Sequence, residues 1–539
     1  MGKFGMGQSI RRIEDQRFVT GTGKYTDDVN LPDQTWLAVL RSPHAHADVK
    51  SIDVSAAKSA AGVLGVFMNE DLEAAGFTGM PFDSVPPGPD GQPPHVPDRP
   101  ILAKGVVRYV GEPVAVVVAE TMGQARDASE LIEVEYDERP AVASMPSALA
   151  DGAPQLFDGV NGNLLVHWSM GDKDATEAAF AKADRVVAID LINNRIAPTA
   201  IEPRGALAEY DSDTNRYTLT TGSQGSHKLK QWITGKNDKK AADIPIENLR
   251  VICPDVGGGF GMKNFLFNEP LAALFATKVV GRPVKWTGDR TESFLNDTHG
   301  RDQINHAELA VTNEGRFLAI RVSSMGNVGA YVSQFGAMIP TMAGCGMLCG
   351  CYDLEAAHVD VKVTMTNTTP VDAYRGAGRP ESAYVVERLV DKAAREMGIP
   401  ADEIRRRNFV KPEAFPYQTP LGMPYDSGEY AKLMNLAMGR ANWAGFEGRR
   451  KESAANGKLR GLGMSYYIEA CGGGPTEYSK LSVDESGKVT VRSGSQNNGQ
   501  GQETTFSQLT AEALGIEMDD IEVRMGDTDD IEQGMGTGG

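Results

Sequence analysis

Short apolar runs and helical stretches alternate along the chain, a pattern typical of an α/β protein. In the first part of the chain the apolar runs predict strands, and one stretch with helical spacing lies between two of them. We therefore expect a first α/β domain at residues 18–140. Its predicted strands are residues 36–40, 63–67, 114–118 and 130–136, and its helical stretch is residues 122–131.

A strand, a glycine loop and a helix follow one another near the middle of the chain. The apolar run 249–253 leads into Pro-Asp-Val-Gly-Gly-Gly-Phe-Gly-Met-Lys at 254–263, and a helical stretch spans 269–280. Glycines let the backbone bend freely and leave N–H groups able to face an anion. Taken alone, the loop fits either an anionic cofactor or a tight turn with a helix packed against it.

Two more glycine loops precede predicted helices. Residues 372–379 lead into an amphipathic stretch at 381–397, and residues 498–501 lead into a helical stretch at 503–514. The amino-terminal end of a helix carries partial positive charge and free N–H groups. Several such ends could converge on one large anionic ligand, and we expect a cofactor that carries a pyrophosphate.

The sequence also contains a diverged internal duplication. A predicted hairpin at 207–221 is followed by Gly-Ser-Gln224 and a segment that starts at Ile244. A second hairpin at 481–492 is followed by Gly-Ser-Gln496 and a similar segment from Ile516, at the same separation along the chain. Two matches in one register indicate that the same structural unit occurs twice.

Composition and charge exclude several classes of function. The 539 residues carry a net charge of −18 and no basic run, which disfavours nucleic acid and anionic membranes as partners. No apolar segment is long enough to span a membrane, so we expect a cytoplasmic protein. Five scattered cysteines, with Cys345, Cys349 and Cys351 in no known metal-binding spacing, and the pair His44 and His46 are interpreted as structural.

Neither common nucleotide-binding fingerprint fits the central loop. A Walker loop requires Ser or Thr after Gly-Lys, whereas Gly261 is followed by Met262, Lys263 and Asn264. The third glycine also arrives one residue too early for a dinucleotide-binding Gly-x-Gly-x-x-Gly loop. ATP and NAD are therefore disfavoured.

Five ordered motifs resemble the large, molybdopterin-binding subunit of the molybdenum hydroxylases, the family of xanthine dehydrogenase, aldehyde oxidase and aerobic carbon monoxide dehydrogenase. The segments 41–46 and 110–115 resemble its N-terminal hammerhead domain, and 257–263, 373–378 and 499–501 resemble its cofactor loops. The resemblance implies an α/β (α+β) fold with the hammerhead at 18–140. Two duplicated molybdopterin-binding domains are then expected at 164–412 and 430–539, the second of them incomplete.

The resemblance also implies a molybdenum centre held through a pterin dithiolene, with no direct protein ligand and, in bacterial members, usually a cytosine dinucleotide tail. Gln224 would hydrogen-bond the apical oxo group and Arg375 would lie beside the equatorial ligands. These two are the expected catalytic residues, and the glutamate that acts as general base is expected beyond residue 539. Further cofactor contacts are expected from Gly258, Gly259, Phe260, Gly261, Gly376, Gly499, Gln500, Gly501, Gly538 and Gly539.

Three positions mark the expected substrate pocket. Purine-oxidising members carry an acidic residue where Asn264 stands and a phenylalanine where Ala377 stands, and both are absent here. Tyr466 keeps the other stacking position aromatic, so a flat substrate could still be held. Carbon monoxide dehydrogenases carry the cysteine that binds copper where Gly376 stands, so we expect no copper and no oxidation of CO.

We therefore expect hydroxylation of an aldehyde or N-heteroaromatic C–H bond, with water as the oxygen source. No iron–sulfur or flavin motif is evident in the sequence, so the resemblance implies a small Fe-S subunit and a medium FAD subunit, in a dimer of heterotrimers. Without the general base, residues 1–539 alone are expected to be nearly inactive. The alternative is a relative that binds the cofactor, or serves as a scaffold, without turnover. Glu202 is interpreted as the partner of Arg204 in a structural ion pair.

Overall fold

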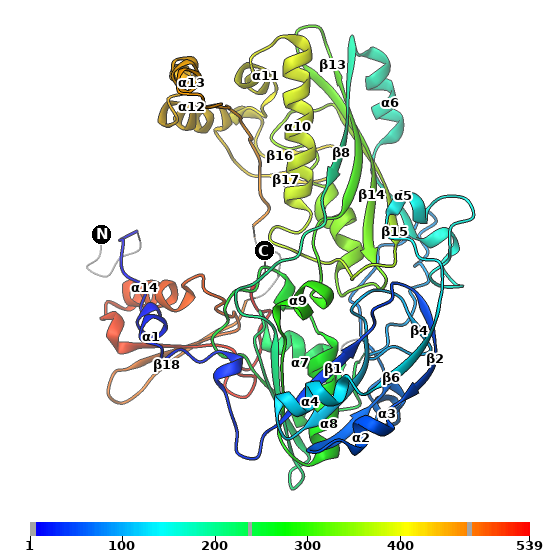
Figure 1. Ribbon diagram of the computed structural model, residues 1–539. Helices are drawn as coiled ribbons and strands as arrows, with labels where there is room; N and C mark the ends of the chain where they lie inside the picture. The colour runs from blue at the N-terminus through cyan, green and yellow to red at the C-terminus, as the bar shows by residue number, and fades with distance from the viewer. Residues whose placement is uncertain (1–6, 236–239, 472–476, 539) are drawn as a thin grey trace.

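The described residues form five β-sheets, arranged in two lobes and a smaller C-terminal part (Figure 1). The structure is a computed structural model, and it describes residues 7–235, 240–471 and 477–538. None of the helices in these ranges is long and apolar enough to span a membrane. The prediction of an α/β fold is confirmed.

The largest sheet has seven strands and joins two of the predicted domains. Strand β1 pairs in parallel with β12, so strands from residues 18–140 continue the sheet of the second domain. The two domains therefore share one sheet, which the sequence did not indicate. In sheet order the strands are β11 (Leu249–Ile252), β10 (Arg216–Thr221), β9 (Gly205–Asp211), β12 (Val284–Thr287), β1 (Thr35–Arg41), β5 (Pro113–Ala119) and β3 (Val63–Phe67).

Three main helices pack on this sheet. Helix α8 (Asn268–Val280) lies on β9 and β12, α7 (Ser226–Thr234) lies on β11, and α4 (Met122–Ser129) lies on β1 and β5. Ten consecutive residues of α8 are buried, as expected for a helix that is apolar on all sides. Its left-handed C-cap is Gly281, which explains why the helix ends there.

The hammerhead part adds a small three-stranded sheet beside the large one. Its order is β4 (Val106–Val107), β2 (Ala47–Asp53) and β6 (Glu133–Glu138), with α2 (Ser55–Ser59) and α3 (Asn69–Ala74) nearby. His46 is buried here with its Nδ1 2.9 Å from the Pro140 carbonyl oxygen, and no cluster of three metal-ligating side chains occurs in the described ranges. The buried hydrogen bond is compatible with a structural role for His46, which stays a prediction.

A five-stranded sheet forms the second lobe (Figure 1). Helix α10 (Arg379–Met397) packs against β8 and β13, α6 (Lys173–Lys182) packs against β14 and β15, and α11 (Ala401–Asn408) packs on α10. The core of this lobe buries Cys345, Cys349 and Cys351, and burial raises the pKa of Cys345 and Cys349 to about 12. The strand order is β7 (Leu164–Gly171), β15 (Ala356–Met365), β14 (Phe317–Gly329), β13 (Gln303–Val311) and β8 (Arg185–Asn193).

The internal duplication is visible in the strand pairing. In the first copy β9 and β10 are antiparallel and β11 joins β10 in parallel; in the second copy β18 (Ser479–Val483), β19 (Val489–Ser493) and β20 (Ile521–Arg524) do the same. The register of the parallel pair also corresponds, since Tyr217 opposes Leu249 and Val489 opposes Ile521. Helix α14 (Gln502–Leu514) covers β20 as α7 covers β11.

Helix α8 has no counterpart on the second copy within the described residues. In the first copy α8 covers β9, and the equivalent strand β18 is exposed along its whole length. Leu481 and Val483 point to the α14 side of the sheet but remain 49% and 64% exposed. One helix is too narrow to cover all three strands.

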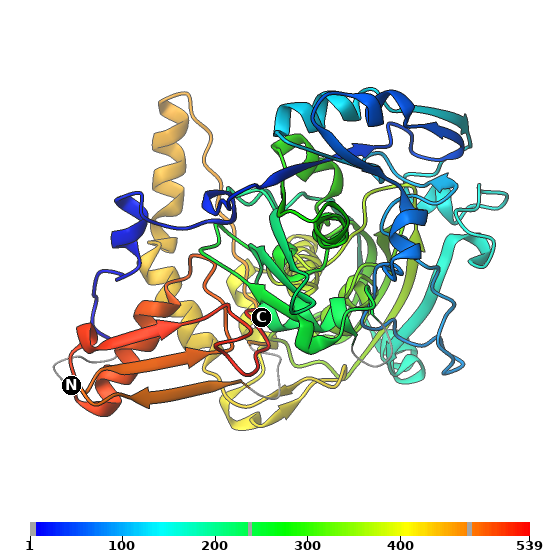
Figure 2. The same ribbon diagram turned by 90° about the horizontal axis from the view of Figure 1, so that it is seen from below.

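An N-terminal arm, residues 8–19 with α1 (Asp15–Val19), crosses to the second copy and lies beside α14 (Figure 2). The Ile13 N–H donates to Thr504 Oγ1 at 2.9 Å, and Thr504 also bonds the buried Glu14. Arg17 bridges Asp255 of the first copy and Glu503 of the second. The arm therefore ties the two copies together.

The remaining elements connect these parts. They are α5 (Met145–Ala148), α9 (Arg290–Asn296), α12 (Tyr430–Arg440), α13 (Phe446–Ala455), β16 (Tyr417–Gln418) and β17 (Pro424–Tyr425).

Candidate active site

Gln224 joins the first glycine loop, residues 254–263, to the C-terminal segment, residues 534–538. It lies between β10 and α7, where its side-chain Oε1 accepts from the Gly261 N–H at 2.8 Å and its Nε2 donates to the Thr537 carbonyl at 2.8 Å. Its backbone N–H donates to the Lys263 carbonyl and its carbonyl accepts from the Thr537 N–H. Both ends of the amide are thus fixed.

The second glycine loop, residues 372–378, lies against the first. The Arg375 N–H donates to the Phe260 carbonyl at 2.9 Å, and the Arg375 guanidinium lies 5.6 Å from the centroid of the Phe260 ring. A Cβ on Gly261 would come within 2.5 Å of the Ala373 carbonyl oxygen, so only glycine permits this contact. Gln224, Phe260, Gly261 and Arg375 are therefore brought together, and their contacts with a cofactor stay a prediction.

Three residues of these loops adopt left-handed backbone conformations without being glycine. Phe260 has φ 55°, Arg375 has φ 20° and Ala377 has φ 42°. Such conformations cost on the order of 1–3 kcal/mol each and persist where the surroundings impose them. Phe260 is nevertheless 39% exposed, so a large aromatic ring is held at the surface of the junction between the loops.

The third glycine loop, residues 498–501, reaches the same place through Thr537. Thr537 Oγ1 donates to the Gln496 carbonyl at 2.7 Å and accepts from the Gln496 N–H at 3.0 Å. Gln496 is the counterpart of Gln224 in the second copy, so one threonine is bonded to both glutamines. Gly501 is the N-cap of α14, and Gln502, the first residue of this helix, donates from its Nε2 to Thr537 Oγ1 at 3.3 Å.

Backbone donors and buried polar oxygens at this junction are left without protein partners. In the described part of the chain, no acceptor bonds the N–H groups of Gly258, Gly259, Phe260 and Gly376. Side-chain oxygens of Asn264, Asn498 and Gln502 are buried and unpaired. Unpaired buried polar groups are costly, so their concentration at one place fits a polar ligand with both donors and acceptors. A pterin cofactor of the kind that the sequence resemblance implies would meet this requirement.

Glu202 and Lys263 form an ion pair beneath the first loop. Lys263 Nζ lies 2.6 Å from Glu202 Oε2, which also accepts from the Gly257 N–H at 2.7 Å. The predicted pairing of Glu202 with Arg204 was wrong, because Arg204 is bonded to Glu269 and Asp297 instead. Burial lowers the pKa of Lys263 while Glu202 opposes that shift, and the pair anchors the loop from its buried side.

The second loop begins at a buried carboxyl group. Asp372 accepts from the N–H groups of Phe335 and Ala373. Burial raises the pKa of Asp372 to about 6, although these hydrogen bonds lower it. Arg375 takes part in no ion pair among the residues that the structure describes, so its cation remains available to a ligand.

The three predicted pocket residues lie in different surroundings. Asn264 is beside the C-terminal segment, with its Nδ2 3.8 Å from the position of a Cβ on Gly538, and Ala377 is in the second loop. Tyr466 packs against Phe409 with ring centroids 4.7 Å apart and donates its hydroxyl to the Tyr430 carbonyl. Its role in holding substrate stays a prediction, as do the cofactor contacts of Gln500 and Gly538, and Gly539 lies outside the described residues.

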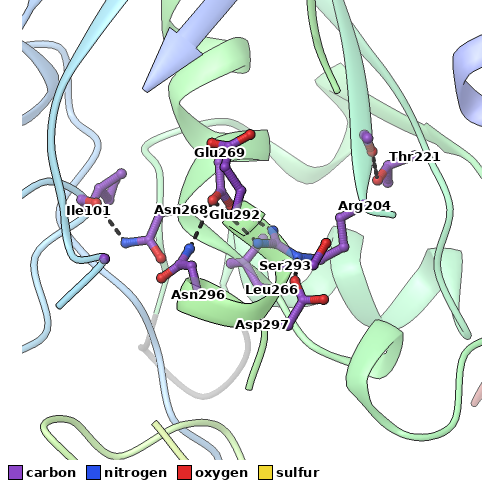
Figure 3. A network of polar contacts seen from close by, with 12 residues as sticks. Ile101, Arg204, Thr221, Leu266, Asn268, Glu269, Glu292, Ser293, Asn296 and Asp297 are labelled. Carbon is purple, nitrogen blue, oxygen red and sulfur yellow. Dashed lines mark hydrogen bonds and ion pairs between the residues drawn. The ribbon is translucent and has the colours of Figure 1, made fainter. Parts of the chain in front are cut away.

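A buried polar network fixes the hammerhead part to the start of α8 (Figure 3). Glu269 is bonded to Arg204 at 2.6 Å, Arg41 at 2.8 Å and the Asn296 side chain at 2.8 Å. Arg204 also bonds Asp297 at 2.6 Å. Burial alone would raise the pKa of Glu269, but Arg204 and Arg41 hold it below its usual range. The network holds the helix that follows the first glycine loop.

Sequence reasoning missed two residues that organise the loops. Thr537 carries a usable signal, since it stands between glycines in a glycine-rich segment, whereas Arg301 stands in an ordinary polar stretch before β13. Arg301 donates to the carbonyls of Tyr374 and Arg375. Its contact with the second loop follows only from the tertiary fold.

Comparison with known proteins agrees with this architecture. Residues 20–140 match the family described as aldehyde oxidase and xanthine dehydrogenase, a/b hammerhead domain. Residues 156–409 and 436–539 match two families described as molybdopterin cofactor-binding domain.

Among curated proteins, the carbon monoxide dehydrogenase large chain of Afipia carboxidovorans is 34% identical over 99% of this chain and 68% of its own length. The nicotine 6-hydroxylase large subunit of Paenarthrobacter nicotinovorans is 33% identical over 99% of this chain and 65% of its length. The chain thus spans about two thirds of these relatives.

Among solved structures, quinoline 2-oxidoreductase from Pseudomonas putida 86 has 35% identity and a TM-score of 0.93, covering 100% of this chain and 68% of the other. Reconstituted CO dehydrogenase from Oligotropha carboxidovorans has 32% identity and a TM-score of 0.89, covering 99% of this chain and 68% of the other. The chain belongs to the molybdenum hydroxylases, as a large subunit that binds the molybdopterin cofactor.

Proposed function

We propose that this subunit oxidises an N-heteroaromatic C–H bond, or an aldehyde, at a molybdopterin cytosine dinucleotide cofactor held between its glycine loops. The observation that carries the proposal is the convergence of Gln224, Phe260, Gly261 and Arg375 on one junction with free N–H groups. Similarity to a quinoline oxidoreductase and a nicotine hydroxylase favours the heteroaromatic substrate.

When bound, the cofactor supplies two-electron oxidation of the substrate with oxygen from water. The chain's own contribution is binding and orientation. The Gln224 amide, fixed at both ends, offers a neutral hydrogen-bonding group, and the free N–H groups of the first loop face the ligand without adding charge. The guanidinium of Arg375 offers a positive charge to the anionic cofactor. Electrons then pass to separate Fe-S and FAD subunits, in a dimer of heterotrimers.

Substrate-dependent dye reduction by the full-length protein with its partner subunits tests this proposal. We expect turnover with quinoline-like or pyridine-like rings, and the oxygen isotope of labelled water in the product. Acid hydrolysis should release cytidine monophosphate in proportion to molybdenum. A protein that contains molybdenum but reduces no dye with any N-heterocycle or aldehyde would instead be a scaffold relative.

Gly376 predicts that copper is absent from this site. Glycine offers no thiolate for Cu(I), which prefers soft ligands. The loop also excludes a cysteine in its present conformation, because Gly376 has φ 100° and a Cβ would lie 2.4 Å from Pro380 Cγ. We expect no CO oxidation and no stoichiometric copper by elemental analysis; copper close to molybdenum in X-ray absorption spectra would contradict this.

A further inference from the structure

Arg301 lies behind the second glycine loop and contacts two of its carbonyl groups. Its Nη1 donates to the Tyr374 carbonyl at 2.7 Å and its Nη2 donates to the Arg375 carbonyl at 2.9 Å. Nη1 also lies 3.0 Å from Glu381 Oε1, on the first turn of α10. The side chain of Arg301 is 11% exposed and that of Glu381 is 2% exposed, so the contacts are sheltered from water.

The position of Arg301 is itself imposed by the fold. Arg301 and Asp302 both adopt left-handed conformations, with φ 64° and 61°. The Asp302 carboxylate is held by Arg195 Nε at 2.7 Å and by the Asn327 side chain at 2.9 Å. Two adjacent strained residues, fixed by charged partners, indicate that the direction of the Arg301 side chain is specified.

The carbonyl contacts determine which way the peptide groups of the loop face. In a trans peptide the N–H points opposite to the C=O. Because the carbonyls of Tyr374 and Arg375 both point to Arg301, the N–H groups of Arg375 and Gly376 point away from it. The first of these N–H groups meets the Phe260 carbonyl of the first loop, and the second has no acceptor among the described residues.

We propose that Arg301 is a positioning residue, which holds the second loop in its strained conformation and thereby presents the Gly376 N–H and the Arg375 side chain to the cofactor. This inference rests on the proposed function only for the identity of the ligand. A planar guanidinium can bond two carbonyls at once, whereas a lysine ammonium on a flexible stem lacks the fixed fork. Glu381 completes the arrangement, since its other oxygen accepts from the Gly378 N–H at 2.8 Å.

Limited trypsin digestion of the full-length protein tests the anchor directly. Arg375 and Gly376 are exposed, and the bond between them is a trypsin site held in a conformation unsuited to the protease. Arg301→Gln should raise the cleavage rate at this bond by about tenfold, a factor that corresponds to ~1.4 kcal/mol. Trypsin should cleave Arg301→Lys nearly as fast as Arg301→Gln. If Arg301→Gln does not fold, Arg301→Lys is the variant to be compared with the wild type.

The molybdenum content of the same preparations supplies the second readout, and we expect it to fall several-fold in both variants. Arg321→Gln is the matched control, because Arg321 pairs with Glu308 and Glu177 on β13 and α6, away from the loops. The proposal would be overturned if trypsin cleaved after Arg375 as slowly in both variants as in the wild type. It would also be overturned if cleavage became faster while the molybdenum content stayed unchanged. If the wild type binds no molybdenum, the proposed function fails, and the digestion alone decides whether Arg301 anchors the loop.

Discussion

Gly259→Val is expected to give a folded protein that contains little or no molybdenum. A Cβ at position 259 would lie 2.6 Å from Gln224 Cγ, so the valine side chain would collide with Gln224. Gln224 would have to move away from the Gly261 N–H and the Thr537 carbonyl. One substitution therefore releases the first loop from the C-terminal segment. The ratio of molybdenum to protein in the purified full-length enzyme measures the effect.

Gly448→Val is a suitable control for this variant. Gly448 lies in α13, and a Cβ there would meet nothing within 4 Å. The control should retain the wild-type molybdenum and cytosine nucleotide content, with only a small loss of stability from a branched residue in a helix. Full cofactor content in Gly259→Val would show that the first loop does not hold the cofactor.

Glu269→Ala is expected to lower the free energy of unfolding by about 3–5 kcal/mol, the usual effect of breaking a buried ion pair. The carboxylate is 1% exposed and neutralises both Arg204 and Arg41, so its removal leaves two buried guanidiniums with one carboxylate partner each. Chemical denaturation monitored by circular dichroism would measure the loss. Glu308→Ala, which removes a more exposed partner of Arg321, should cost at most ~1 kcal/mol.

The ionisation of Glu269 also predicts how the stability of the protein depends on pH. The pKa of Glu269 is depressed in the folded protein, so its stabilising contribution is complete above the pKa of an unfolded glutamate, ~4.3, and is lost as pH falls below that value. Glu269→Gln should therefore show a weaker acid-induced loss of stability than the wild type below pH ~4.3. Parallel pH profiles for the two proteins would contradict the assignment.

Local sequence predicted those parts of the fold that depend on neighbouring residues. The helix predicted at 381–397 is α10, and the stretch at 269–280 is α8 apart from one residue at its start. The duplication was also visible, since matching turns and strands require matching residues at matching positions. The glycine loops were identified because a positive φ and a close backbone approach leave glycine as the residue that fits.

Long-range pairing was beyond this kind of reasoning. Nothing in the pattern of residues 35–41 indicates that β1 pairs with β12, which lies far from it in sequence, at residues 284–287. The partner of Glu202 was wrong for a similar reason: Arg204 is close in sequence, but the strand geometry directs it to Glu269. Arg301 and Thr537 contact residues far away in sequence, so their roles depend on the assembled loops.

In the part of the chain that the structure describes, β18 is an exposed edge strand of the second copy. A strand at the edge of a sheet offers unpaired backbone groups, and exposed apolar side chains next to it favour self-association. Leu481 and Val483 lie at this edge, on the opposite side of β19 from the Cys253 to Gly526 contact that joins the two copies. Among the described residues, the exposed edge and the glycine loops therefore lie on different sides of one small sheet, and polar residues at 481 and 483 would change the edge while leaving the glycine loops intact.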